Sequence, residues 1–558
     1  GPQVAPIMLK EDVTPDELAF VEAHRDELPE LETIMVHRRL YPKNGFAAHL
    51  IGYVGEVSEE MLRLPQYELN EPGDVVGKSG VEEYYNDLLQ GEDGSRKILV
   101  DSHGKEVGRL GTDPAKPGKT LRLTIDLDLQ IAAEQALEGK NGAMVAMDPR
   151  TGEILAMVSR PTFDANDFAV HISRQEWNQL ATDENHPLMN KAIQAQLAPG
   201  STFKIIMSVA GVQEGIAQNL KVNCTGISTF YGHPKRCWVY FEHRSHGAVD
   251  LTKAIYQSCD IFFYTLAEKL GIQRMAKWGH AFGIGEKTGV DLPSEASGVM
   301  PSEEWKIKNF KQKWFAGETV DVGIGQGSLA LTPIQLARAI GAITSQGKLV
   351  RPHVAFPEDL PDTPYYKEAG ARYKSVTNIP IDPAGWDLIT SAMVRVLTPE
   401  GTAFSAHLDG IDFGGKTGSA QVVTIEHAKQ NAEKYKQNSW FVGVTPHRNP
   451  EIVVACLFEG GEHGRLAARM VAQVIRTFVE KQRKIRGNSF AAVDKNGNPL
   501  QVSGIWSDGL RDDHHSDKLD YGTLLFPADQ LKTQQVKGTP TFLLQQPSAN
   551  QSAAGGRP

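Results

Sequence analysis

Hydrophobic positions predict strands in two separate parts of the chain. Residues 142–159, GAMVAMDPRTGEILAMVS, hold two apolar runs with Asp-Pro and Thr-Gly between them, which predicts a β-hairpin. Further strands are predicted at 413–423, 439–446 and 451–460, followed by a helix near 465–484. Strands at both ends with helices between them are typical of an antiparallel sheet flanked by helices, an α+β fold.

The segments before and between these strands are less regular. Residues 121–139 predict a strand and then an amphipathic helix, and 199 to about 300 has a mainly helical pattern. In the N-terminal part we expect a helix in 14–29, capped by Thr14, and a helix followed by strands in 77–108.

Pro and Gly content suggests the domain boundaries. The stretch AKPGKT at 115–120 marks a boundary between an N-terminal domain of mixed helices and strands, 1–120, and a larger second domain, 121–485. Residues 486–558 end in a polar segment rich in small residues, Pro and Gly, so we expect a poorly ordered tail.

Composition excludes several classes of protein. The 558 residues carry a net charge of −10 without a basic block, which argues against nucleic-acid binding. No segment reaches the roughly 18 apolar residues of a membrane span. The chain begins with Gly1-Pro2, a common remainder of tag removal, so we expect a natural membrane anchor upstream of Gln3.

The stretch APGSTFKI places Ser201 three residues before Lys204, behind a Pro-Gly turn. Both side chains are expected on one face of a helix, with Ser201 near its N-terminus, where the free N–H groups favour developing negative charge. A neighbouring amine can activate a serine nucleophile. Taken alone, the tetrad is more typical of a helix with a capping serine and a surface lysine.

Two more groups change this interpretation. YQSCDIFFY supplies Ser258 and Asp260, and GGKTGSAQ supplies Lys416, Thr417 and Gly418 on a predicted strand. A lysine and a hydroxyl at a strand edge can hold a carboxylate, and the glycines let a peptide approach the backbone.

In this order, Ser-x-x-Lys, Ser-x-Asp and Lys-Thr-Gly resemble the three motifs of penicillin-binding proteins and serine β-lactamases. LTIDLDLQ, LAPGSTFK, AIYQSCDIFFY, GIGQGSLALTPIQ and SWFVGVTP are similar to class B penicillin-binding proteins over about 120–485. The Ser-Cys-Asp and Gly-Ile-Gly-Gln-Gly forms resemble the elongation-specific subgroup, penicillin-binding protein 2. The resemblance implies a transpeptidase domain behind an N-terminal pedestal.

The resemblance also implies a role for each motif residue. Ser201 would attack the D-Ala-D-Ala carbonyl of a peptidoglycan stem peptide, with Lys204 as its base. Ser258 would relay a proton to the leaving amine, and Asp260 would orient Ser258 and Lys204. The substrate-binding positions implied by the resemblance are Lys416, Thr417, Gly418 and Ser419. The N–H groups of Ser201 and Ser419 would form the oxyanion hole.

Cys224, Cys237, His246 and Cys259 form a candidate tetrahedral zinc set. Their spacing lacks a tight Cys-x-x-Cys pair, so the pattern alone also fits a Cys224–Cys237 disulfide in an oxidising compartment. In some elongation-type relatives a histidine before glycine and the cysteine of the second motif bind zinc, and His246 and Cys259 match these two. Zinc would be structural, and the resemblance implies no cofactor for the chemistry. Cys456 is expected in the core.

The resemblance implies a bacterial inner-membrane protein whose catalytic domain lies in the periplasm. Its partners would be stem peptides, β-lactams, a membrane glycosyltransferase of the SEDS class and a rod-shape scaffold protein, with residues 1–120 as the docking surface. Two alternatives remain open at this point. One is a β-lactamase or D,D-carboxypeptidase, although we find no acidic loop motif for a deacylating water. The other is a scaffold subunit with little activity of its own.

Overall fold

In the computed structural model, the described residues are 9–500 except 11–12, 29–30, 32, 34–37, 69, 103–105, 171, 422–436 and 462. The predicted tail therefore lies outside them from residue 501 onward. The described residues from 44 to 500 belong to one compact unit. Helix α1 (Pro15–Ala23) belongs to the other unit. It has the predicted Thr14 cap but is shorter than the predicted 14–29.

A five-stranded antiparallel sheet organises the large unit, in the order β13-β14-β15-β5-β6. The strands are β5 (Gly142–Met147), β6 (Ile154–Arg160), β13 (Gly414–Ala420), β14 (Asn438–Thr445) and β15 (Ile452–Phe458). The predicted hairpin is confirmed as β5 and β6, and the three later predicted strands as β13, β14 and β15. The α+β class is thus confirmed.

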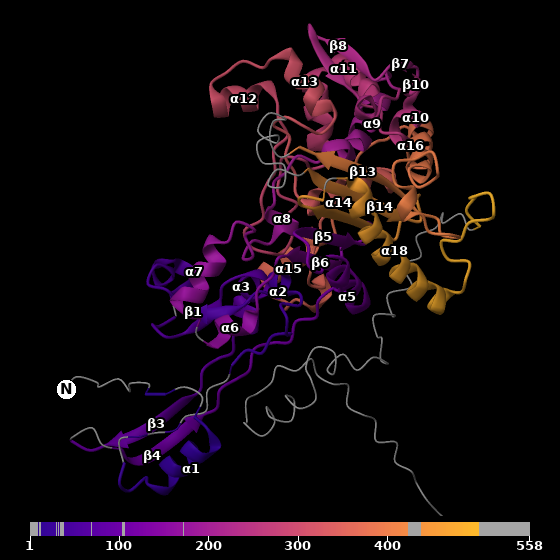
Figure 1. Ribbon diagram of the computed structural model, residues 1–558. Helices are drawn as coiled ribbons and strands as arrows, with labels where there is room; N and C mark the ends of the chain where they lie inside the picture. Colours follow the sequence, from indigo (N-terminus) through magenta and orange to yellow (C-terminus); the bar gives the residue numbers. More distant parts are fainter. Residues whose placement is uncertain are drawn as a thin grey trace, which may run out of the picture. The chain divides into compact units, whose positions relative to one another are not determined.

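Helices cover both faces of this sheet (Figure 1). Strand side chains alternate between two apolar clusters, because successive residues of a strand point to opposite faces. Met144 and Phe441 pack with α5 (Leu127–Ala136) and α18 (Gly464–Arg486), whereas Val145 and Val442 pack with the helices of the other face. These are α8 (Lys191–Gln194), α9 (Lys204–Gln213), α11 (Asp260–Ala281), α14 (Pro333–Thr344) and α16 (Pro383–Arg395).

Two predictions of local structure were wrong. The helical stretch of 199–300 is interrupted by β7 (Val222–Cys224), β8 (Ile227–Phe230), β9 (His233–Arg236) and β10 (Gly247–Val249). These strands are three or four residues long, too short to show a clear period of two. The strand predicted after residue 121 is reduced to one bridge, between Leu123 and Ala355.

The remaining helices are α2 (Ala48–Ile51), α3 (Gly80–Tyr84), α4 (Asn86–Leu89), α6 (Ala165–Val170), α7 (Arg174–Thr182), α10 (Leu251–Tyr256), α12 (Glu303–Phe310), α13 (Ala316–Gly323) and α15 (Pro364–Tyr373). The remaining strands pair as β1 (Val54–Glu56) with β2 (Val75–Gly77), β3 (Ser95–Val100) with β4 (Glu106–Asp113), and β11 (Lys348–Val350) with β12 (Val376–Asn378). In the described part of the chain, no helix has the length and apolar character that crossing a bilayer requires.

The N-terminal segment joins the sheet domain through a buried carboxylate. Tyr85, between α3 and α4, donates a hydrogen bond to Asp291 Oδ2 at 2.6 Å. The backbone N–H groups of Val354 and Ala355 donate to the same carboxylate at 2.6 and 3.0 Å. Asp291 has no exposed surface, so these donors replace the water that the carboxylate loses on folding.

Tyr85→Phe should lower the free energy of unfolding by about 1–3 kcal/mol, because it removes a donor from a fully buried acceptor. Thermal and urea unfolding measure the change. Tyr84→Phe is the matched control: its hydroxyl meets that of Tyr373 at 3.3 Å in a half-buried position, and we expect about 0.5 kcal/mol or less. Equal losses in both variants would contradict the role of Asp291.

Candidate active site

Ser201 lies in a 3₁₀ turn, Gly200–Phe203, that leads directly into α9, whose first residue is Lys204. The predicted helix therefore begins one turn later than expected. Gly200 has a φ of +55°, and a Cβ at this position would lie 2.4 Å from the carbonyl oxygen of Ser419. The residue before the serine must be glycine for the turn to lie this close to β13. Ser201 itself is half-buried.

The Lys204 amine contacts the second motif. Its Nζ lies 2.6 Å from Asp260 Oδ1, 3.0 Å from the carbonyl oxygen of Ser258 and 3.2 Å from Ser258 Oγ. The side chain of Lys204 has no exposed surface, so these three acceptors solvate it in place of water. The predicted association of Lys204, Ser258 and Asp260 is present in the structure.

Lys416 reaches the same hydroxyl from strand β13. Its Nζ donates to Ser258 Oγ at 2.9 Å and to the carbonyl of Thr417 at 3.0 Å. Burial, and then the charge of Lys204, lower the pKa of Lys416 well below 10.5. Ser258 thus lies between two buried amines that come from motifs more than two hundred residues apart.

Ser258 occupies the turn between α10 and α11 in a left-handed conformation, with a φ of +56°. This conformation costs a residue with a side chain about 1–2 kcal/mol. It places the hydroxyl toward both lysines while Asp260 begins α11. Asp260 is held from its other side by the backbone N–H of Trp238, 2.8 Å from Oδ2.

Thr417, Gly418 and Ser419 follow Lys416 along β13. Thr417 Oγ1 lies 2.7 Å from the hydroxyl of Thr402. A Cβ on Gly418 would lie 2.6 Å from the carbonyl oxygen of Pro199, so the space at this glycine is taken by the turn that carries Ser201. Ser419 Oγ accepts a hydrogen bond from Gly464 N at 3.2 Å.

Sequence reasoning assigned no role to Thr402, Trp238 or Gln326, although each contacts a motif residue. The Nε2 of Gln326 donates to the carbonyl oxygen of Ser419 at 3.3 Å. Gln326 belongs to the stretch GIGQG, which was quoted only for its resemblance to the family, and Thr402 belongs to the stretch GTA at 401–403. Trp238 contributes a backbone N–H, which any residue type supplies, so no sequence signal could reveal it.

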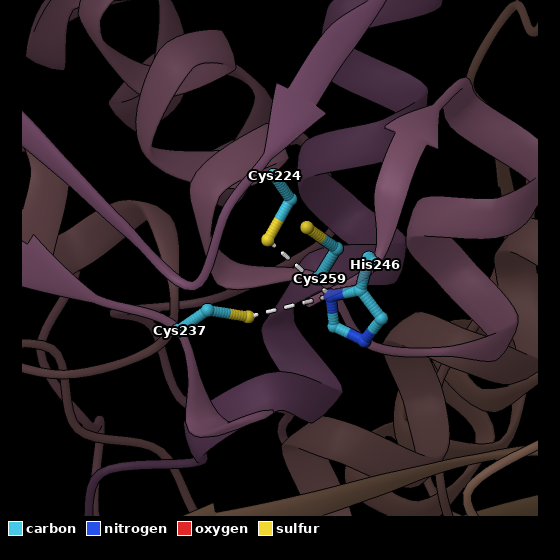
Figure 2. A group of neighbouring side chains, drawn as sticks. All are labelled: Cys224, Cys237, His246 and Cys259. Carbon is cyan, nitrogen blue, oxygen red and sulfur yellow. Dashed lines mark hydrogen bonds between the residues drawn. The ribbon is translucent and has the colours of Figure 1, made fainter. Parts of the chain in front are cut away.

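The four residues of the predicted zinc set come together in space (Figure 2). Their ligand atoms all lie within 4.8 Å of one another, and all four side chains are buried. His246 Nδ1 lies 3.5 Å from Sγ of both Cys224 and Cys237. Pairing of β10 with β7 places Gly247 opposite Cys224 and so brings His246 to the cluster.

The cluster borders the catalytic motif directly. Cys259 lies between Ser258 and Asp260, and the N–H of Asp260 donates to Cys237 Sγ at 3.3 Å. All four cysteines of the chain are free thiols in the structure. Hydrogen bonds from Cys237 and Cys259 lower the pKa of Cys224, and those bonds raise the pKa of the two donors. Cys456 is buried in β15, as expected.

Comparison with known proteins places this site in a family. The penicillin-binding protein transpeptidase domain matches residues 142–476, and the penicillin-binding protein dimerisation domain matches residues 1–123. Peptidoglycan D,D-transpeptidase MrdA of Acinetobacter baumannii is 36% identical over 493 residues, which cover 86% of this chain and 71% of that protein.

Two solved structures are similar over most of the chain. The complex between penicillin-binding protein PBP2 and MreC from Helicobacter pylori has a TM-score of 0.69 at 30% identity and covers 83% of each chain. A structure on the coordination of polymerization and crosslinking by a peptidoglycan synthase complex has a TM-score of 0.67 at 29% identity. It covers 82% of this chain and 80% of that one.

Lys416→Met should raise the melting temperature of the protein at pH 7. The pKa of Lys416 falls on folding, so between its folded value and 10.5 the unfolded chain binds one more proton, and wild-type stability rises with pH. The advantage of the variant should therefore be largest at low pH and shrink as pH approaches 10.5. Melting temperatures of the wild type and the variant between about pH 6 and about pH 10, below the ordinary pKa of lysine, measure this difference.

The control is Lys119→Met, at an exposed lysine. Its melting temperature should follow that of the wild type at every pH. A Lys416→Met advantage that stays constant with pH would contradict a lowered pKa.

Proposed function

Because this chain belongs to the penicillin-binding protein transpeptidase family, we propose that its acylated nucleophile is Ser201. The protein is a serine-type peptidoglycan D,D-transpeptidase of cell elongation. The observation that supports this assignment of the site is the shared hydroxyl of Ser258, which contacts Lys204 and Lys416 beside the turn that carries Ser201.

In the acylation step, Ser201 Oγ attacks the carbonyl carbon of the penultimate D-Ala and transfers its proton to Lys204. The N–H groups of Ser201 and Ser419 stabilise the oxyanion, and such a donor is typically worth about 10²–10³ in rate. When the C–N bond breaks, the amine of the terminal D-Ala leaves with a proton passed through Ser258. Asp260 keeps Lys204 and Ser258 in position.

In the second step, an amine of a neighbouring stem peptide attacks the acyl carbon, loses a proton and releases Ser201. The new amide is the crosslink. Lys416 and Thr417 are the proposed partners of the terminal carboxylate of the donor peptide, because an amine and a hydroxyl lie together at the edge strand. A β-lactam mimics the donor dipeptide and would acylate Ser201 without fast release.

The comparisons favour neither the hydrolase nor the scaffold alternative. We assign residues 121–485 to the transpeptidase domain and 1–120 to the pedestal. The Helicobacter pylori relative bound to MreC and the peptidoglycan synthase complex support a rod-shape scaffold protein and a membrane glycosyltransferase as partners. We place the catalytic domain in the bacterial periplasm, at the inner membrane.

We also propose that Cys224, Cys237, His246 and Cys259 hold a structural zinc ion. In a tetrahedral zinc site, bonds of about 2.3 Å to sulfur and about 2.0 Å to nitrogen place the two ligand atoms about 3.5 Å apart. The Sγ to Nδ1 distances of Cys224 and Cys237 to His246 have this value. Zinc would brace Cys259, and with it the neighbouring Ser258 and Asp260, and would take no part in the chemistry.

Ser201→Ala should abolish covalent labelling by a penicillin. Intact-mass spectrometry should find one drug adduct on the wild type and none on the variant. The matched control is Ser208→Ala in α9, one turn after Lys204. The Ser208 hydroxyl donates to the carbonyl of Lys204 at 2.7 Å, and this variant should keep the adduct. Hydrolysed drug with unmodified wild-type protein would indicate a hydrolase, and intact drug without an adduct would indicate a scaffold.

Elemental analysis of the purified protein should find about one zinc per chain, because four ligands complete a structural site. Cys237→Ser should lose most of the metal and lower the melting temperature. Cys456→Ser, which removes a buried thiol outside the cluster, should retain the metal. A metal-free protein with a Cys224–Cys237 disulfide in peptide mapping would contradict the proposal.

A further inference from the structure

The outer edge of strand β13 faces the turn that carries Ser201. β13 ends the sheet order, and within the described residues no further strand pairs with its outer edge. A Cβ on Gly200 would lie 2.4 Å from the carbonyl oxygen of Ser419 and 3.1 Å from its nitrogen. The N–H and C=O of one residue in an antiparallel strand point to the same side. Both backbone groups of Ser419 therefore point away from β14, toward the active site.

An extended peptide binds such an edge by adding a strand to it. On the proposed function, the acyl donor is a peptide whose reacting carbonyl must reach Ser201 while its own amide groups pair with β13. The carbonyl of Ser419 is then the acceptor available to an amide N–H of the donor. In the structure that acceptor already has a partner, the side-chain amide of Gln326, at 3.3 Å.

The backbone around Gln326 has little freedom. Gly200 N donates to the carbonyl of Gly325 at 2.9 Å, and Gln326 N donates to the carbonyl of Asp321 at 3.0 Å. A Cβ on Gly325 would lie 1.9 Å from the carbonyl oxygen of Gly200, so the two loops are in direct backbone contact. The side chain of Gln326 is half-buried, with part of its surface exposed to solvent. Side-chain rotation therefore frees the Ser419 carbonyl without moving the loop.

We propose that Gln326 is a specificity-determining residue whose side-chain amide competes with the donor peptide for the Ser419 carbonyl at the outer edge of β13. Its side-chain amide occupies the Ser419 carbonyl in the free enzyme and rotates away when an amide N–H of the donor takes its place. The exchange replaces one hydrogen bond by another, so it lowers the affinity for amide-bearing ligands and leaves ligands without that amide unaffected. This inference rests on the proposed function and adds a specificity determinant to the same site.

Acylation kinetics with two β-lactams test the proposal. Benzylpenicillin carries an acylamino side chain with an N–H, and a carbapenem carries a hydroxyethyl group in its place. Gln326→Ala should raise the second-order acylation constant for benzylpenicillin by about two- to tenfold, the range expected for one net hydrogen bond. The gain should lie in the binding constant, with the rate at saturation unchanged. The constant for the carbapenem should change less than about twofold.

Gln326→Met keeps the bulk of the side chain and removes the donor, so it should behave like Gln326→Ala. Gln312→Ala, at an exposed glutamine, is the control and should match the wild type with both drugs. Melting temperatures establish that each variant is folded. Equal changes with both drugs, or slower acylation by benzylpenicillin, would overturn the proposal while leaving the proposed function intact. A wild-type protein that neither drug acylates would contradict both the proposed function and the proposed role of Gln326.

Discussion

Two buried lysine amines meet at one serine hydroxyl, and the rest of the site is built around this contact. Lys204 and Lys416 have no exposed surface, and both donate to Ser258 Oγ. Asp260 is the carboxylate that contacts Lys204. Two ammonium groups beside one carboxylate in a dry interior are unfavourable, so one amine tends to lose its proton. The direction of the Lys416 pKa follows from this imbalance.

Each member of this contact is held by a different kind of structure. Lys416 lies on a strand whose neighbours fix its register, and Lys204 opens a helix whose apolar face fills the core. Ser258 lies in a strained left-handed turn between two helices. The next residue, Cys259, belongs to the Cys and His cluster. A structural metal there would stabilise the segment of the site that has the least regular backbone.

Close backbone packing explains why glycines surround the turn that carries Ser201. Gly200, Gly325 and Gly418 each face a carbonyl oxygen of another segment at a distance that excludes a Cβ. The turn with Ser201, the loop with Gln326 and strand β13 therefore form one tightly packed unit.

Long periodic segments and the three catalytic motifs could be recognised from the chain itself. The hairpin at 142–159 and the late strands are apolar runs bounded by turn residues, which predict the sheet, and the helix at 464–486 follows from its amphipathic pattern. The short strands within 222–249 could not be predicted, because three or four residues do not establish a period. The contacts of Gln326 and Trp238 also could not be predicted. Gln326 donates to a backbone carbonyl, and Trp238 contributes a backbone N–H, so neither contact depends on a recognisable pair of side chains.

The order of the main elements, the α+β class and the residue types available for acyl transfer can be inferred from the chain alone, because they depend on local pattern and side-chain chemistry. The tertiary structure alone decided which of those residues touch. Lys204 and Lys416, which both contact Ser258, lie more than two hundred residues apart, and the four residues of the candidate metal site come from separate elements within 224–259. Their distances depend on how the sheet and helices pack, and no local interaction along the chain specifies that packing.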